Sequence, residues 1–157
     1  MNAFEGCPGS KVLDFKEKDG KVAEDTIGAA ESQLRQWPIQ LHLVAPTAPY
    51  YEEADVLLAA DCVAYALGDF HRKFLKGKSI AIACPKLDAG QDIYLQKLKS
   101  WFEDARINTL TVMIMQVPCC MGLLQLAQQG LQASQRKVPI KSLVVGVQGE
   151  ILQEEWV

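Results

Sequence analysis

The stretch Asp55-Val-Leu-Leu-Ala-Ala60 decides the fold, because its apolar residues follow one another without the alternation of a half-exposed strand. Three further runs have the same character: Ser79–Ala83, Leu110–Met115 and Ser142–Val147. A near-continuous apolar run is typical of a strand that is covered on both faces. The sequence therefore predicts four buried strands, to which the shorter range Gln40–Val44 adds a fifth candidate.

Helical patterns separate these runs, over Val63–Leu75, Asp92–Ala105 and Met121–Gln135. In the second range the apolar residues recur at spacings near three and four, which gives one buried helix face. They are Ile93, Leu95, Leu98, Trp101 and Phe102. The alternation of strands and helices predicts an α/β fold. We expect a mostly parallel sheet of about four to five strands, flanked by helices in Rossmann-like or flavodoxin-like layers.

The length of 157 residues predicts one domain. Residues 1–30 are expected to form a loosely packed arm, or a hairpin in which a charged turn at Lys16–Lys21 joins Lys11–Phe15 to Lys21–Val22. Residues 31–157 are expected to form a single α/β domain. The first range is rich in charge and glycine, whereas the apolar runs all lie in the second.

Charge and hydropathy exclude several classes of protein. Lys and Arg total 16 against 19 Asp and Glu, which argues against a nucleic-acid-binding surface. The first residues lack the apolar stretch of a signal peptide, and glutamines and a proline interrupt the uncharged run Thr109–Gln135. Neither a leader nor a membrane contact is therefore expected. We expect a cytoplasmic protein whose thiols stay reduced.

Cysteines follow three of the predicted strands. Cys62 comes two residues after Ala60, Cys84 directly follows Ala83, and the pair Cys119–Cys120 follows the third run. In open α/β sheets, ligands bind at the carboxyl ends of the strands. Four thiols there match the ligand count of a zinc ion or an iron–sulfur cluster. A cysteine also packs well as a small buried hydrophobe, so inert core positions remain the alternative.

The adjacency of Cys119 and Cys120 tilts the prediction from zinc toward a larger cluster. Two neighbouring side chains seldom reach one small ion, whereas a helix N-terminus turns both toward a group of several irons. His71 is an additional candidate ligand if the chain breaks at Gly68 before a later helix; otherwise it is a structural histidine. The use of Cys7 is left open.

The charged residues after Cys84 are candidates for contact with a bound group. Lys86 and Asp88 would touch a cofactor or balance its charge, and solvated loop charges are the alternative. No phosphate-binding loop, dinucleotide fingerprint or nucleophile elbow is present. No residue stands out as a general acid or base, so the sequence leaves the question of enzyme activity open.

Five motifs carry a family resemblance. They are Trp37–Leu43 (WPIQLHL), Ala59–Cys62 (AADC), Phe70-His71, Cys84–Asp88 (CPKLD) and Val117–Leu123 (VPCCMGL). They resemble a poorly characterised bacterial and archaeal family, whose longer members carry a ferredoxin-type 4Fe–4S segment and are often labelled iron–sulfur binding proteins. The similarity runs from about Ser32 to Gly149 and implies that the four cysteines of the strand ends belong to one pattern.

This chain departs from that family in two ways. It lacks a C-x₂-C-x₂-C-x₃-C-P run, so the ferredoxin label is expected to describe a neighbouring module of the relatives. It also has Gln116 where an acidic residue is expected in such relatives.

The leading hypothesis is a metal-binding protein that holds an iron–sulfur cluster and acts in electron transfer or redox sensing with a redox partner protein. Zinc binding, thiol-dependent redox catalysis without a metal, and a plain interaction domain are the alternatives.

Overall fold

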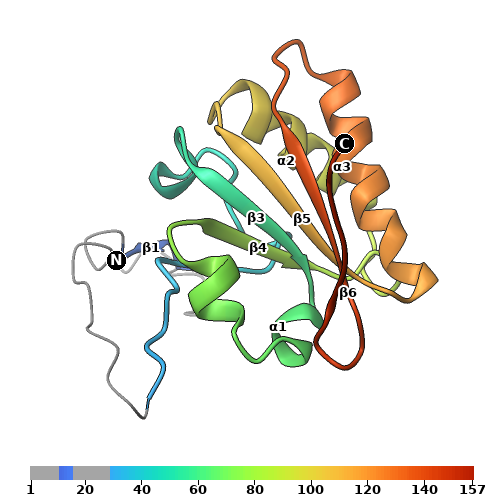
Figure 1. The fold of residues 1–157 in the computed structure, drawn as a ribbon. Coiled ribbons are helices and arrows are strands. Elements are labelled where there is room, and N and C mark those ends of the chain that lie inside the picture. Colours follow the sequence, from blue (N-terminus) through green and yellow to red (C-terminus); the bar gives the residue numbers. More distant parts are fainter. Residues whose placement is uncertain (1–10, 16–28) are drawn as a thin grey trace.

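A five-stranded sheet forms the centre of the computed structural model, which describes residues 11–15 and 29–157. Its strands are β3 (Asp55–Ala60), β4 (Ser79–Ala83), β5 (Thr109–Met115), β6 (Ile140–Val145) and β7 (Ile151–Trp156). They lie in the order β4-β3-β5-β6-β7 (Figure 1). The first four pair in parallel, and β7 pairs antiparallel to β6. The predicted α/β class with a mostly parallel sheet is confirmed.

Helices cover both faces of this sheet. The short helix α1 (Val63–Ala66) and the π-helical turn η4 (Phe70–Leu75) connect β3 to β4 on one face (Figure 1). On the other face α2 (Gln91–Glu103) packs against α3 (Met121–Ala133). This arrangement follows from right-handed crossovers, because the chain moves one way along the sheet after β3 and the opposite way after β4.

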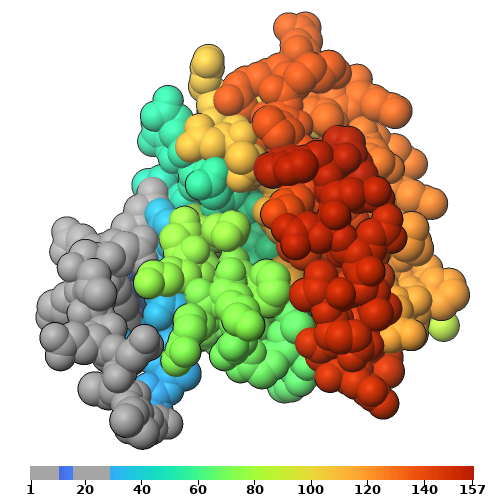
Figure 2. Space-filling model, in the orientation of Figure 1, coloured from blue at the N-terminus to red at the C-terminus, as the bar shows by residue number. Residues whose placement is uncertain are grey.

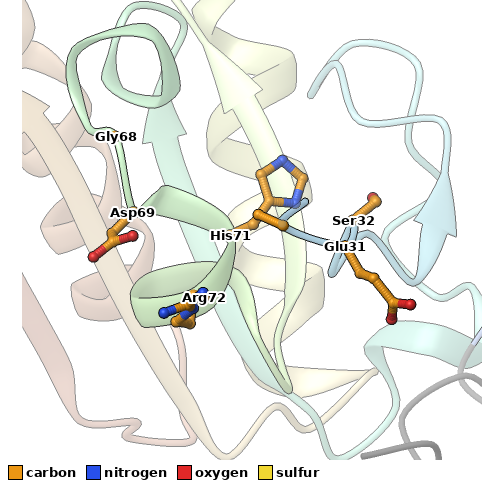
Figure 3. Close-up of a pocket in the computed structure, with 7 residues that line it drawn as sticks. Glu31, Ser32, Gly68, Asp69, His71 and Arg72 are labelled. Carbon is orange, nitrogen blue, oxygen red and sulfur yellow. The ribbon is translucent and has the colours of Figure 1, made fainter. Parts of the chain in front are cut away.

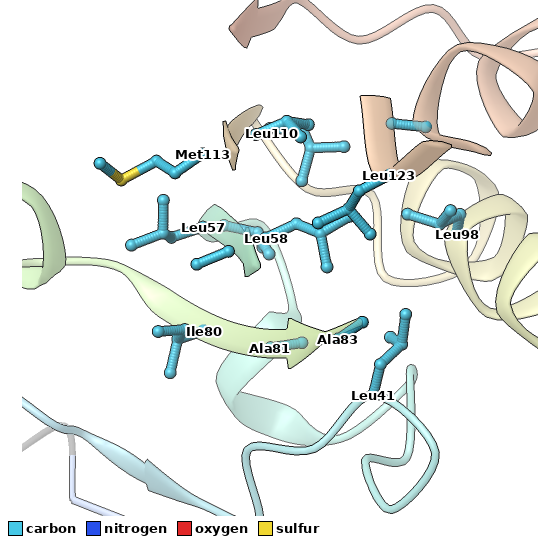
Figure 4. Packing of buried hydrophobic residues seen from close by; sticks show 14 of the residues in the cluster. Leu41, Leu57, Leu58, Ile80, Ala81, Ala83, Leu98, Leu110, Met113 and Leu123 are labelled. Atoms are coloured by element: carbon cyan, nitrogen blue, oxygen red, sulfur yellow. The ribbon is translucent and has the colours of Figure 1, made fainter. Parts of the chain in front are cut away.

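The core lies on both sides of β3, as the continuous apolar run predicts. Leu58 points toward Leu98 of α2 and Leu123 of α3, while Leu57 points to the opposite face with Ile80 of β4 (Figure 4). Each of these side chains is buried. At about 25 cal/mol per Å² of apolar area removed from water, burial of one leucine stabilises the fold by roughly 2 kcal/mol. The sheet that carries the strand ends is therefore a rigid support.

The outer edge of β4 is closed by the chain before it. The fully buried Gln36 donates through Nε2 to the carbonyl of Ile80 at 2.7 Å and accepts from the Ile80 N–H at 2.7 Å. Further along, Ile82 donates its N–H to Ile39, and Leu41 donates to the carbonyl of Ile82. The peptide groups of Ile80 and Ile82 are thus satisfied without a full neighbouring strand.

The predicted strand Gln40–Val44 is wrong, because only Gln40 forms a bridge, to Ile82. The N–H groups of Leu43 and Val44 turn back to the carbonyl of Gln40, which makes a turn. The Lys97 ammonium holds this turn by donating to three carbonyl oxygens. These belong to Leu41, His42 and Val44, at 2.8–2.9 Å. Burial lowers the pKa of Lys97.

The range Val63–Leu75 is not one helix. Its first part ends at Ala66, Leu67 adopts extended backbone angles, and η4 begins at Phe70. The interpretation with a break at Gly68 is therefore the right one. Asp69 does not cap the second segment with its side chain; its carboxylate instead forms an ion pair with Lys73 at 3.3 Å.

The buried face of α2 also differs from the sequence pattern. Leu98, Trp101 and Phe102 are buried as predicted, but Tyr94 is buried where Ile93 was expected. Ile93 is 44% exposed. Tyr94 occupies the inner position because its hydroxyl donates a hydrogen bond to Asp88 in the loop that follows β4, so the whole side chain can be buried.

The two-residue strands β1 (Leu13–Asp14) and β2 (Gln36–Trp37) pair antiparallel, so part of the N-terminal region contacts the domain. The charged turn at Lys16–Lys21 and the expected hairpin partner Lys21–Val22 lie outside the described residues. The strand β7 has no counterpart in the sequence-based prediction. All six of its residues are exposed, so no buried apolar pattern marks it.

Candidate functional site

The four described cysteines lie at the carboxyl ends of three neighbouring strands. Cys84 follows β4, Cys62 follows β3, and Cys119 and Cys120 lie in η5 (Pro118–Cys120) after β5. Because β3 lies between β4 and β5, the expected meeting of these strand ends at one edge of the sheet is confirmed. All four thiols are free. We call this region the carboxyl edge.

The topological switch point of the sheet lies between β3 and β5. The connection that leaves β3 crosses one face through α1, and the connection that leaves β5 crosses the other face through α3 (Figure 1). Two neighbouring strands whose connections diverge in this way leave a crevice at their carboxyl ends. Cys62 and the Cys119–Cys120 pair flank this crevice.

Close backbone packing brings the Cys84 loop to the start of α3. A Cβ atom at Gly122 would lie 3.2 Å from Cβ of Pro85, which directly follows Cys84. A side chain at residue 122 would therefore push the two loops apart. The glycine allows the loop after β4 and the first turn of α3, which follows Cys120, to lie in contact.

Cys120 is the buried member of the sulfur group. Its thiol contacts the side chain of Cys119 and interacts electrostatically with Cys62. Burial raises the pKa of Cys120, its two cysteine neighbours raise it further, and a hydrogen bond from the backbone of Met115 opposes the shift. Negative charges on neighbouring sulfurs would repel a charge on Cys120, which is why the two neighbours add to the effect of burial on its pKa. Cys62 and Cys119 are both exposed, and Cys84 is partly buried.

Asp88 fixes the loop that carries Cys84. Its Oδ2 accepts the backbone N–H of Cys84 at 2.9 Å and the hydroxyl of the buried Tyr94. Burial raises the pKa of Tyr94, and the Asp88 carboxylate that accepts the hydrogen bond of its hydroxyl raises it further. The Asp88 carboxylate is therefore engaged in hydrogen bonds within the protein, whereas Lys86 in the same loop is exposed. Of the two residues predicted to contact a bound group, Asp88 therefore stabilises the loop.

A second carboxyl group lies at the same edge. Asp61 precedes Cys62, and its Oδ1 is buried without a hydrogen-bond partner in the described part of the chain. Burial raises the pKa of Asp61, and the charge of Asp88 raises it further. Negative charges on Asp61 and Asp88 therefore repel each other across the ends of β3 and β4.

His71 lies in η4 and interacts with the N-terminal segment. Its Nδ1 accepts the backbone N–H of Gln33 at 3.0 Å. The ring borders a surface pocket between Glu31 and Ser32 on one side and Asp69 on the other (Figure 3). The structure thus gives His71 a partner away from the cysteines, in line with the structural alternative.

The described residues contain no group of three or more His, Cys, Asp or Glu side chains that is already arranged around one ion. Tetrahedral zinc would need four sulfurs about 3.8 Å apart, as Zn–S bonds of about 2.3 Å require. The thiols of the carboxyl edge come from three strand ends and are not drawn together to that degree.

Two residues of this edge were not predicted as part of the site. The position of Asp61 between a predicted strand and a cysteine could have indicated its place at this edge. Nothing in the sequence indicated Tyr94, because a tyrosine in a helical pattern is expected to be an ordinary core residue. Gln116 also has a defined contact, since its Oε1 accepts the N–H of Val147 in the turn after β6 at 2.9 Å.

In the described residues, no helix is both long and apolar enough to cross a membrane.

Comparison with known proteins agrees with this architecture. A protein of Archaeoglobus fulgidus described as uncharacterized is 26% identical over 120 residues, which cover 76% of this chain and 83% of the relative. No solved structure matches the chain. A family model described as a Rossmann-like domain matches residues 48–157, the range that holds the whole five-stranded sheet and the four described cysteines. The chain therefore belongs to this family of Rossmann-like domains.

Proposed function

We propose that the chain is a cytoplasmic redox protein that binds an iron–sulfur cluster through Cys62, Cys84, Cys119 and Cys120. The observation that carries the proposal is the meeting of four free thiols at three adjacent strand ends, beside the switch point of the sheet. When bound, such a cluster accepts or donates one electron at a potential that burial and hydrogen bonds to sulfur set.

The chemistry of the donor set supports the cluster. Soft thiolates are the usual ligands of iron–sulfur centres, and joint deprotonation of neighbouring thiols becomes favourable once iron cations replace the protons. Burial raises the pKa of Cys120, its two cysteine neighbours raise it further, and bound iron cations would favour its thiolate form. Two exposed thiols, Cys62 and Cys119, give access from solvent, while Cys120 anchors the group from the interior.

The positions of the two histidines support a cluster over nucleophilic thiol catalysis. His71 accepts a hydrogen bond from Gln33, and His42 lies 2.6 Å from the Ala89 carbonyl through Nε2 while its ring contacts Tyr94. The chain has no other histidine. A catalytic cysteine normally needs a base or a cation that lowers its pKa, and burial moves the pKa of Cys120 in the opposite direction.

The test is an anaerobic purification followed by measurement of iron, acid-labile sulfide, zinc and the visible spectrum. We expect iron and sulfide in comparable amounts and a broad absorbance near 400 nm. Serine variants of the four cysteines, made one at a time, should lose most of the iron. His71→Gln is the control, and its iron content should match that of the parent protein. Full iron content in all four serine variants would sink the proposal.

A metal-free dithiol function is the second candidate, favoured by the contact between the Cys119 and Cys120 side chains. Here the Cys119 thiolate would attack a partner disulfide and release one partner thiolate. Cys62 would then displace the second partner thiol and leave a Cys62–Cys119 disulfide. Adjacent Cα atoms lie only about 3.8 Å apart, which strains a Cys119–Cys120 disulfide. This candidate predicts a metal-free protein that loses two titratable thiols on exposure to oxidised glutathione.

A further inference from the structure

Exposed apolar side chains lie on the loops that carry the cysteines and on the neighbouring loop after β6. They come from every loop that leaves a parallel strand at the carboxyl edge, and we call them the apolar rim: Tyr65, Leu87, Val117, Met121 and Val147. Tyr65 is 94% exposed and Leu87 is 82% exposed. Side chains of this size are seldom left in water without a reason when they gather in one region.

The loops that carry the rim contact one another, so the rim side chains lie on one connected set of loops. A Cβ atom at Gly149, in the turn after β6, would lie 2.5 Å from the carbonyl oxygen of Ala66 in α1, the helix that holds Tyr65. Figure 2 shows this turn and α1 side by side along the lower edge of the molecule. The same turn binds the loop after β5 through the hydrogen bond from Val147 to Gln116.

The fourth loop closes the arrangement on the other side. Pro85, two residues before Leu87, packs against Gly122, the neighbour of Met121. The loops after β4, β5 and β6 and the helix α1 are therefore joined in sequence around the crevice. The exposed thiols of Cys62 and Cys119 lie on the same loops as Tyr65 and Val117.

We propose that the apolar rim is the docking surface for a redox partner protein that exchanges electrons with the sulfur site. This inference rests on the proposed function and names the class of partner for it. Contact between apolar surfaces excludes water and brings the partner's redox group close to the exposed thiols.

The size of the rim selects this occupant over a second copy of the chain. The five side chains offer on the order of 600 Å² of accessible surface, whereas a stable dimer buries about 800 Å² or more on each partner. Transient electron-transfer complexes form the small end of the range of interface areas.

The experiment uses a photo-crosslinking amino acid, benzoylphenylalanine, placed at Tyr65 or at Leu87 of the full chain in cells of the source organism. Leu152 of β7, which is 53% exposed and lies outside the rim, is the matched control position. We expect both rim positions to form an adduct with the same protein, which carries a flavin, haem or iron–sulfur group. The control position should not form that adduct.

The identified protein is then purified and mixed with the reduced chain, and electron exchange is followed by stopped-flow absorbance. Tyr65→Ser and Leu87→Ser should slow the exchange by about tenfold while the visible spectrum of the chain stays unchanged. Adducts only between copies of the chain, adducts with a protein that holds no redox group, or no adduct at all would overturn the inference.

Failure of the rim and failure of the proposed function give different results. A chain that contains iron and sulfide but forms no rim adduct keeps the proposed function and loses the docking surface. A chain without iron that still forms adducts with one redox protein keeps the docking surface and loses the cluster.

Discussion

Replacement of Asp88 by alanine should destabilise the chain and loosen the Cys84 loop. The variant leaves the buried Tyr94 hydroxyl without its acceptor, which costs about 1–3 kcal/mol. It also removes the acceptor of the Cys84 N–H, which is only partly buried and regains some solvation from water. We therefore expect a total loss of about 2–4 kcal/mol in the free energy of unfolding.

A double-mutant cycle separates this contact from a general effect of the loop. Tyr94→Phe alone should cost about 1–2 kcal/mol, because the Asp88 carboxylate loses one hydrogen-bond donor while it keeps the Cys84 N–H. In the double variant no hydroxyl is left unsatisfied, so its loss should fall short of the sum of the two single losses by about 1–2 kcal/mol. Asp92→Ala, an exposed change in the first turn of α2, is the control and should cost about 0.5 kcal/mol.

Urea unfolding, followed by circular dichroism at 222 nm under anaerobic reducing conditions, gives the free energy of unfolding of the parent protein and the four variants. Iron content, measured on the same samples, should fall in Asp88→Ala and change little in Asp92→Ala. Additive losses for Asp88→Ala and Tyr94→Phe would refute the claim that one hydrogen bond joins these side chains. An Asp88→Ala loss no larger than that of the control would refute the role of Asp88 in the loop.

Three further predictions follow from buried or close-packed groups. Gln36→Met should lower the free energy of unfolding by about 2–3 kcal/mol in urea, because the Ile80 N–H loses its partner, whereas Gln128→Met on exposed helix surface should change it by less than about 0.5 kcal/mol. Both Gly149→Ala and Gly77→Ala place a methyl group on a residue with positive φ, but only the alanine at 149 would collide with backbone, at the Ala66 carbonyl. The melting temperature of Gly149→Ala should therefore drop at least twice as far as that of Gly77→Ala. Stability should fall as pH rises above about 10, because buried tyrosines with raised pKa keep their protons while the unfolded chain releases them. Absorbance at 295 nm should show these tyrosinates appearing together with unfolding, and their appearance in the folded chain would contradict the prediction. The tyrosines are Tyr50, Tyr51 and Tyr94.

The continuous apolar runs predicted the sheet because burial on both faces leaves a mark on every residue of a strand. The ranges at 55–60 and 79–83 match β3 and β4, and the run at 110–115 lies within β5. β7 leaves no such mark, since its residues face solvent. The range Gln40–Val44 misled for the opposite reason, because Leu41 and Val44 are buried although they lie in a turn, whose carbonyls Lys97 binds.

The candidate site was predictable as far as strand ends are predictable. Placing Cys62, Cys84 and Cys119–Cys120 at one edge needs only the strand positions and the assumption that the strands are neighbours. The contact of Asp88 with Tyr94 joins a loop to a helix through a hydrogen bond, which no spacing in the sequence reveals. His71 depended on the path of the chain after Gly68, and that path leads it to Gln33.

The side chain of Gln36 has a consequence for how copies of the sheet can associate. Its amide takes the hydrogen bonds that an intruding strand would otherwise form with Ile80, so β4 offers no template for strand addition there. Within the described residues, β7 is the other outer strand of the sheet. Its Glu154 forms an ion pair with Lys141 and its Glu155 is exposed, and charged side chains along an outer strand disfavour the addition of another strand. One outer strand of the sheet is thus protected from strand addition by a buried amide and the other by charged side chains.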